Sequence, residues 1–245
     1  MLRSIEELYG YTIRAADGDI GKVHDFYFDD EFWTIRYLVV DTGTWLTGRR
    51  VLIAPASLGQ PDWDTKTLPV RLTKKQVEDS PLVGTDQPVS RQLQVDLHHY
   101  YGWPHYWAGT SVGTPFLIVP PDQSQEEESG DPHLRSSREV IGYHIQATDD
   151  EIGHAEDFIV QDTGWVIRYM VVDTRNWLPG KKVLVAPDWI EEVEWVERKV
   201  HVTLERDSVE ESPEFEPGMP VNRTYEQSLY DFYGRPAYWL DKQYS

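Results

Sequence analysis

Two acid–base pairs are the residues best placed to do chemistry. Asp25 and Arg36 lie on neighbouring strand-like stretches, and Asp157 and Arg168 repeat them 132 positions later. If residues 29–32 form a hairpin loop, Asp25 faces Arg36, and the same construction opposes Asp157 to Arg168. Such a pair could shift a pKa for catalysis, or it could simply fix strand register. We predict structural ion pairs and no catalytic residue.

Histidines and carboxylates also raise the question of a metal. His98, His99 and His105 cluster near the end of the first half, but their counterparts 132 positions later are not histidines. Residues 17–19 with Asp25 lack the length and the bidentate glutamate of an EF-hand loop. No glycine-rich phosphate loop and no nucleophile elbow are present. We therefore predict neither a metal nor a cofactor.

Aromatic residues gather at two further places, each with a Tyr-Gly or similar turn inside a dense run of rings. Such rings could stack on bases or sugars, or could anchor a protein interface. We expect each run to fold back across a barrel, its own or that of the other copy, because it is too apolar to remain in water. The predicted interface aromatics are Tyr101, Trp103, Tyr106, Trp107, Tyr233, Tyr238 and Trp239.

All these residues belong to a stretch that the chain contains twice. The repeat runs without a gap from Arg3/Arg135 to Trp107/Trp239, with roughly 40 per cent of positions identical, far beyond chance self-similarity. Each copy is long enough to bury a modest core of its own. The predicted domains are residues 1–107, a flexible linker at 108–134, and residues 135–245.

Alternating apolar residues predict a sheet of about five short strands in each copy. Gly21 is expected to let another backbone come close. A short helix should start at Thr73, which forms a capping box with Gln76. The stretch 189–195 could add a strand in the second copy only, because Pro61 disfavours it in the first. In the first copy the strands are expected near 11–15, 20–28, 33–41, 50–53 and 68–72.

Composition limits the possible partners. The chain has 245 residues, no cysteine and a formal net charge of −19. Residues 3–107 carry 11 Lys/Arg against 15 Asp/Glu, a net of −4, and residues 135–239 carry 11 against 21, a net of −10. An acidic surface repels phosphate backbones, so direct nucleic-acid binding is disfavoured and a basic protein is the easier partner. With no apolar stretch long enough to span a bilayer and no secretory signal pattern, a cytoplasmic location is expected.

The repeated residues resemble the PRC-barrel superfamily, small β-barrels named after the cytoplasmic domain of the photosynthetic reaction centre H subunit. The similarity covers the turn 17–21, Asp25, the strand 33–40 and the segment 50–55, with the same pattern in the second copy. The aromatic ends resemble the tails of stand-alone bacterial PRC-barrel proteins of unknown function. The resemblance implies a mainly β fold of two small barrels, each followed by a short helix and an aromatic-rich extended arm.

What the resemblance implies about function is an adaptor, since every matching motif is a fold signature. We expect a non-enzymatic protein that binds or scaffolds another protein, with two barrels that dock through their arms as an internal pseudo-dimer. Peripheral association with a membrane complex and homo-oligomerisation are both compatible with it. The alternative is a protein that binds a small ligand in a crevice between the barrels; an enzyme is a distant third.

Overall fold

The computed structural model describes residues 1–83, 89–107, 130–174 and 181–240. The chain divides into two compact units. We call residues 8–136 the N unit, and residues 1–7 together with 137–245 the C unit. The two units therefore do not coincide with the two sequence repeats.

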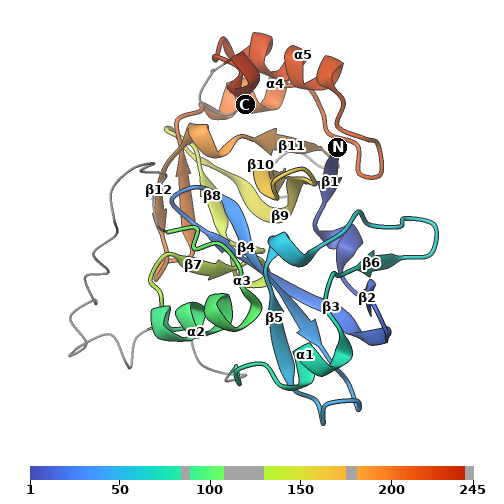
Figure 1. The fold of residues 1–245 in the computed structure, drawn as a ribbon. Coiled ribbons are helices and arrows are strands. Elements are labelled where there is room, and N and C mark those ends of the chain that lie inside the picture. Colours follow the sequence, from blue (N-terminus) through green and yellow to red (C-terminus); the bar gives the residue numbers. More distant parts are fainter. Residues whose placement is uncertain (84–88, 108–129, 175–180, 241–245) are drawn as a thin grey trace. The chain divides into compact units, whose positions relative to one another are not determined.

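The N unit is built on a mixed sheet (Figure 1). The central strand β3 pairs antiparallel with β2 and β4, β5 adds to β4, and the short β6 runs parallel to β2. The strand β4 is buried continuously from Tyr37 to Val40, so its apolar residues lie in the core on both faces. The strands are β2 (Thr12–Ala15), β3 (Gly18–Asp29), β4 (Thr34–Asp41), β5 (Arg50–Ile53), β6 (Thr67–Pro69) and β7 (Leu134–Ser136).

The C unit repeats this arrangement with one strand more. Its β9 pairs with β8 and β10, β11 adds to β10, and β13 runs parallel to β8. The extra strand β12 pairs with β13, which confirms the additional strand expected in the second copy. The strands are β1 (Leu2–Ser4), β8 (His144–Gln146), β9 (Glu151–Gln161), β10 (Val166–Asp173), β11 (Lys182–Val185), β12 (Ile190–Glu194) and β13 (Lys199–Val202).

Short helices follow the strands in both repeats. The capping box of Thr73 and Gln76 opens α1 as predicted. The helices are η1 (Glu6–Leu8), η2 (Pro55–Ser57), α1 (Lys74–Glu78), α2 (Arg91–Tyr101), α3 (Ser137–Val140), η3 (Pro187–Trp189), α4 (Arg206–Glu211), α5 (Arg223–Tyr233) and η4 (Tyr238–Leu240). No helix within the described ranges is long and apolar enough to cross a membrane.

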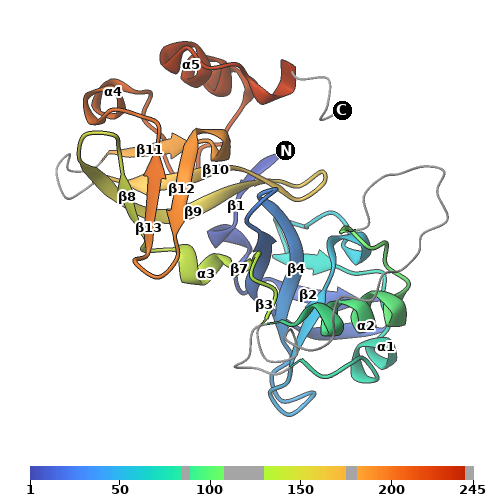
Figure 2. The same ribbon diagram turned by 90° about the vertical axis from the view of Figure 1, so that its left-hand side faces the viewer.

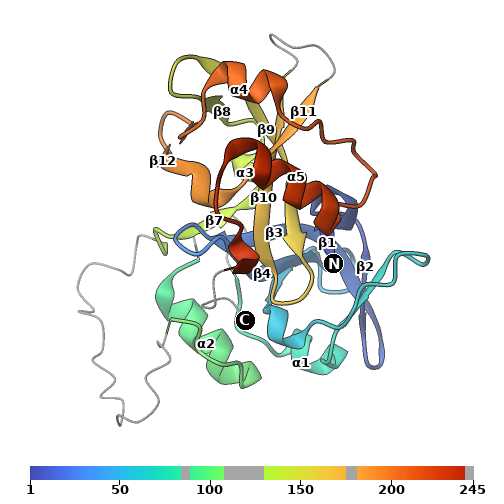
Figure 3. The same cartoon turned by 90° about the horizontal axis from the view of Figure 1, so that it is seen from above.

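A helix precedes each aromatic run: α2 ends at Tyr101 and α5 ends at Tyr233, and most of the predicted interface aromatics follow in non-helical segments or in the short η4. Helix α2 lies over the N-unit sheet (Figure 2), and α5 lies over the C-unit sheet beside β10 (Figure 3). Ser90 and Asn222 cap the amino ends of these helices through their side chains. Gly102 and Gly234 close the carboxyl ends in the left-handed conformation that glycine adopts without strain.

Two three-residue strands, β1 and β7, have changed places between the repeats. β1 comes from the first repeat but pairs with β9 in the C unit, and β7 opens the second repeat but pairs with β3 in the N unit. We call β1 and β7 the head strands, since each stands at the start of its repeat. The sequence pattern alone did not predict them.

Gly21 has the role that its position in the strand predicts. A Cβ atom there would lie 2.2 Å from the carbonyl oxygen of Asp41, and one at Gly153 would lie 2.1 Å from that of Asp173. Both glycines also have φ angles, 153° and 135°, that other residues rarely adopt. The backbones of neighbouring strands therefore approach closely at this point in each unit.

Candidate functional site

The predicted ion pair between Asp25 and Arg36 does not form. The hairpin loop lies one residue later than expected, and β-bulges near Asp25 and Phe28 shift the register. Asp25 therefore lies opposite Val39. Arg36 instead pairs with Asp29 at 3.2 Å, with both side chains largely buried.

The second repeat departs from the prediction in the same way. Asp157 lies opposite Val171, because the hairpin loop is again one residue later and Arg168 is an extra, bulged residue of β10 between the loop and this pair. The Arg168 Nε donates a hydrogen bond to the Gln161 side chain at 2.9 Å. Gln161 stands where the first repeat has Asp29, so the charged pair of one repeat becomes an amide contact in the other.

The two buried aspartates hold the head strands. The Ser136 hydroxyl donates to Asp25 Oδ2 at 2.5 Å, and the Ser4 hydroxyl donates to Asp157 Oδ2. Asp157 also accepts hydrogen bonds from the backbone N–H groups of Glu6 at 3.0 Å and Phe158 at 2.7 Å. Burial raises the pKa of Asp157 to about 6, although these hydrogen bonds oppose the shift. Each aspartate thus anchors a strand contributed by the other repeat.

A buried polar cluster fills the space between β4 and α2 in the N unit. Gln94 is its hub: its Nε2 donates to Asp131 Oδ2 at 2.8 Å, and its Oε1 accepts from the Tyr106 hydroxyl. The Tyr37 hydroxyl lies 2.9 Å from His98 Nε2 and 3.3 Å from the same Gln94 oxygen. We call Tyr37, Gln94, His98, Tyr106 and Asp131 the N cluster.

The hydrogen bonds of His98 fix its tautomer. Its Nδ1 lies 2.8 Å from the carbonyl oxygen of Pro104, which can only accept, so Nδ1 carries the proton. Its unprotonated Nε2 therefore accepts a hydrogen bond from the Tyr37 hydroxyl. Burial lowers the pKa of His98 to about 4, and burial likewise raises the pKa of Tyr37. The ring is therefore neutral at pH 7.

Asp131 supplies the charge of the N cluster. It pairs with Arg91 at 2.7 Å, and its backbone N–H donates to the carbonyl of Val89. Its side chain is 3 % exposed. Asp131 lies in the stretch predicted to be a flexible linker; residues 108–129 of that stretch lie outside the described residues, whereas Asp131 near its end is buried.

The C unit has the equivalent cluster with a different hub. Glu226 Oε1 accepts hydrogen bonds from the hydroxyls of Tyr169 and Tyr238, both at 2.8 Å. Its other oxygen lies 3.2 Å from Arg223. Tyr230 stands where the N unit has His98, and burial raises the pKa of Tyr169. We call Tyr169, Arg223, Glu226, Tyr230 and Tyr238 the C cluster.

The predicted interface aromatics pack on their own unit. Trp103 is buried and donates its indole N–H to Ser57 Oγ at 2.7 Å, and its ring stacks on Tyr101 at 4.2 Å. The guanidinium of Arg36 lies 4.1 Å from the Tyr106 ring centre, and that of Arg168 lies 4.1 Å from the Tyr238 ring centre. Their use as an interface with another protein stays a prediction. The remaining rings make the same kind of contact: Trp107 with His98, Tyr233 with Trp189, and Trp239 with Arg223.

The histidines considered as metal ligands in the sequence make other contacts. His98 belongs to the N cluster, and His105 stacks against it with ring centres 5.5 Å apart. Among the residues that the structure describes, no three His, Asp or Glu side chains come together as metal ligands.

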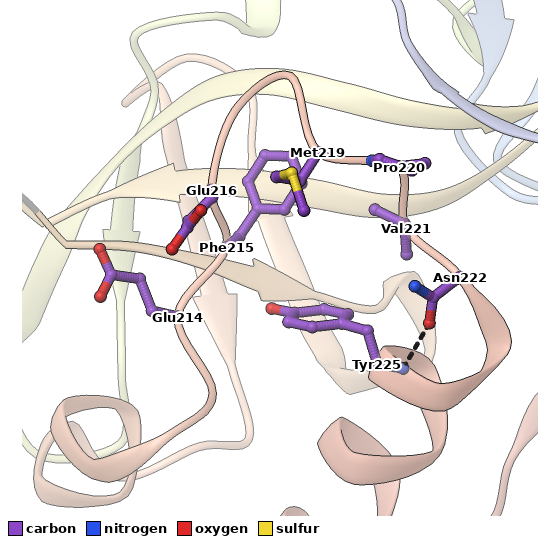
Figure 4. Close-up of a pocket in the computed structure, with 8 residues that line it drawn as sticks. All are labelled: Glu214, Phe215, Glu216, Met219, Pro220, Val221, Asn222 and Tyr225. Carbon is purple, nitrogen blue, oxygen red and sulfur yellow. Dashed lines mark hydrogen bonds between the residues drawn. The ribbon is translucent and has the colours of Figure 1, made fainter.

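A pocket of about 250 Å³ opens in the C unit, between α5 and the loop that precedes it. Figure 4 shows the Phe215 and Met219 side chains on one side and the Tyr225 ring on the other, with the Glu214 and Glu216 carboxylates together at one end. Phe215 is buried, whereas Met219 is 62 % exposed. The remaining lining residues are Pro220, Val221 and Asn222.

A second, smaller cavity of about 100 Å³ shares the loop of this pocket. Phe215, Met219 and Val221 line both, and the smaller cavity reaches Leu2 and Ser4 of the head strand β1. Sequence analysis did not predict this site. The only indication in the sequence is residues 214–219, rich in Pro, Gly and Glu, where the two repeats differ at every position.

Comparison with known proteins identifies the first repeat. Residues 2–76 match the family model of the PRC-barrel domain. An uncharacterized protein of Deinococcus radiodurans is 35% identical over 85 residues, which cover 34% of this chain and 30% of the relative. The chain thus matches less than a third of that relative's length. The matched domain begins at Leu2 and therefore includes the head strand β1.

Proposed function

We propose that this PRC-barrel-containing protein is a non-enzymatic adaptor that binds a basic segment of another protein. The observation that carries the proposal is the C-unit pocket, which combines apolar walls with two carboxylates at one end. An apolar side chain of the partner would enter between Met219 and Tyr225, while a neighbouring Lys or Arg would meet Glu214 and Glu216. Aromatic and methionine-lined pockets of this kind supply the strongest contacts of protein interfaces.

Charge supports the same partner class. The second repeat has a net charge of −10, from 11 Lys/Arg and 21 Asp/Glu. An acidic surface speeds encounter with a basic partner and repels nucleic acid and anionic lipid. The proposal includes a cytoplasmic location for the adaptor, either free or at the cytoplasmic face of a membrane complex.

The buried clusters support binding over catalysis. His98 is the natural candidate for a general base. However, its unprotonated Nε2 already accepts a hydrogen bond from the Tyr37 hydroxyl, and its pKa is lowered to about 4. Glu226 is likewise occupied by two phenols and Arg223. Side chains whose polar atoms are hydrogen-bonded in this way stabilise the packing of a helix on a sheet.

A small ligand is the competing occupant of the pocket. Small-molecule sites usually enclose about 300–1,000 Å³ and bury most of the ligand. The pocket of about 250 Å³ is smaller, and Met219 at its edge is 62 % exposed. One or two side chains of a longer partner fit this shape better than a whole metabolite.

The test compares capture of proteins from a lysate by three full-length forms. Glu214→Gln with Glu216→Gln alters the pocket, and Glu191→Gln with Glu192→Gln makes the same charge change on exposed residues of β12. We expect basic proteins whose capture falls about five- to tenfold with the pocket variant and is unchanged with the control. High salt should lower their binding to the unaltered chain.

Equal capture by all three forms would overturn the proposal. A metabolite panel that stabilises the unaltered chain against heat, and loses this effect in the pocket variant, would favour the small ligand instead.

A further inference from the structure

The head strands of the two repeats are identical. Leu2-Arg3-Ser4 and Leu134-Arg135-Ser136 are the same tripeptide, 132 positions apart. Each forms three residue pairs with the long strand of the other repeat. Identical strands have no local reason to prefer one sheet over the other.

The places that receive them are also equivalent. Ser4 pairs with Ile159 in β9, and Ser136 pairs with Tyr27 in β3. Tyr27 and Ile159 occupy equivalent positions of the two repeats, 132 residues apart. In both places the serine hydroxyl donates to a buried aspartate, Asp157 or Asp25. We call the edge of β9 or β3 together with its aspartate a slot. Slot and head strand are thus interchangeable between the units.

The domain itself includes its head strand. The PRC-barrel match begins at Leu2, whereas the compact N unit begins at Leu8. A domain whose own first strand is replaced by the identical strand of another domain is the definition of strand exchange. In this chain the donor and the receiver happen to be covalently linked.

We propose that the slot beside β9 also accepts the head strand of a second copy of this chain, so that the protein forms exchanged dimers. The contacts made by Ser4 with Asp157 are the same whether both residues belong to one chain or to two. The balance between the two forms is therefore set by concentration. Linked partners compete at an effective concentration of about 1 mM, so exchange between copies becomes extensive only near that value.

The test uses the absence of cysteine from the chain. Leu2 pairs with Gln161, and the hydrogen bonds of the flanking pairs, such as Ile5 N–H to the Phe158 carbonyl, make 2 and 161 a close, non-hydrogen-bonded pair suited to a disulfide. Full-length Leu2→Cys and Gln161→Cys variants are unfolded together in urea, refolded and oxidised. The control replaces Gln161→Cys by Val196→Cys, a residue of the C unit that is 92 % exposed.

After refolding at about 1 mM we expect the Leu2→Cys and Gln161→Cys mixture to give at least about ten times more mixed covalent dimer than the control. Refolding at about 10 µM should remove this difference. The effective concentration of the chain's own head strand is then about a hundredfold higher than the concentration of head strands from other copies. The double variant Leu2→Cys/Gln161→Cys at low concentration should close its disulfide within one chain.

Mixed dimers no more abundant than in the control, at either concentration, would overturn the proposal. Light scattering of the unaltered chain gives an independent answer without cysteines. Refolded at about 1 mM, it should contain dimer that a 10 µM sample lacks, and a monomer at both concentrations would contradict exchange.

Discussion

In the N unit the carboxylate of the buried cluster comes from Asp131, just before β7, whereas in the C unit it comes from Glu226, within α5. The helix position equivalent to Glu226 is the neutral Gln94. Duplicated sequences have thus kept a carboxylate between helix and sheet while changing the residue that provides it. As a result, α2 is tied through Asp131 to the segment that carries the head strand β7, whereas α5 itself supplies the carboxylate of its cluster.

The largest expected difference between the two clusters is the loss of unfolding free energy when the hub residue is replaced. Glu226→Leu should cost about 3 kcal/mol, because the buried phenol of Tyr169 and the half-buried phenol of Tyr238 lose their acceptor and Arg223 loses its partner. Gln94→Leu should cost about 2 kcal/mol, since Tyr37 keeps His98 and Asp131 keeps Arg91. Urea unfolding of both variants measures the two costs. Equal costs would mean that the charge on the hub is irrelevant.

Acid should weaken the N cluster through His98. The pKa of this ring is lowered to about 4, below its ordinary value of 6.5, so the unfolded chain binds the proton first as pH falls. Stability is therefore lost between pH 6.5 and 4, by about 2 kcal/mol between pH 7 and 5. His98→Tyr, which introduces the residue of the C cluster, should abolish this loss in unfolding measured at the two pH values. A variant that still loses it would place the titrating group elsewhere.

Acid should act in the opposite direction at the slot of the C unit. The pKa of Asp157 is raised to about 6 from 3.8, so the folded chain binds the proton first as pH falls. Its contribution to stability rises by about 1 kcal/mol between pH 7 and 5. Asp157→Asn should remove this rise, which hydrogen exchange of β9 peptides at both pH values would detect. If the Asp157→Asn variant keeps the same pH dependence, the assignment of this rise to Asp157 is contradicted.

The smallest difference lies at the hairpins. Arg36 pairs with Asp29, a charged partner, and Arg168 with Gln161, an amide. Arg36→Ala should cost about 0.5 kcal/mol more than Arg168→Ala, and 1 M salt should remove the difference. Thermal unfolding of both variants in low and high salt compares them. A difference that survives in high salt would come from packing on the aromatic rings instead.

The sequence predicted the features that depend on neighbours along the chain. The repeat at a fixed offset located the strands, Thr73 and Gln76 opened α1, and Gly21 marked the close backbone approach. Helices α2 and α5 were not predicted, although Ser90 and Gly102 bracket α2 with a typical cap at each end.

The features that were missed depend on residues far apart. The β-bulges that move Asp25 away from Arg36 leave no mark on an alternating pattern. Asp131 lies outside the repeated stretch, so comparing the copies could not find it. The head strands have three residues each, too few for a period to show, and their partners lie in the other repeat.

The position of β1 has a consequence for synthesis on the ribosome. Ser4 and Asp157 are 153 residues apart. At translation rates of about 5–20 residues per second, the first strand made waits roughly 8–30 s for its partner. During that time the vacant edge of β3, which fits the same tripeptide, is its nearest neighbour along the nascent chain. The final arrangement therefore requires the growing polypeptide to keep this early segment free, or to release it, before the second half is complete.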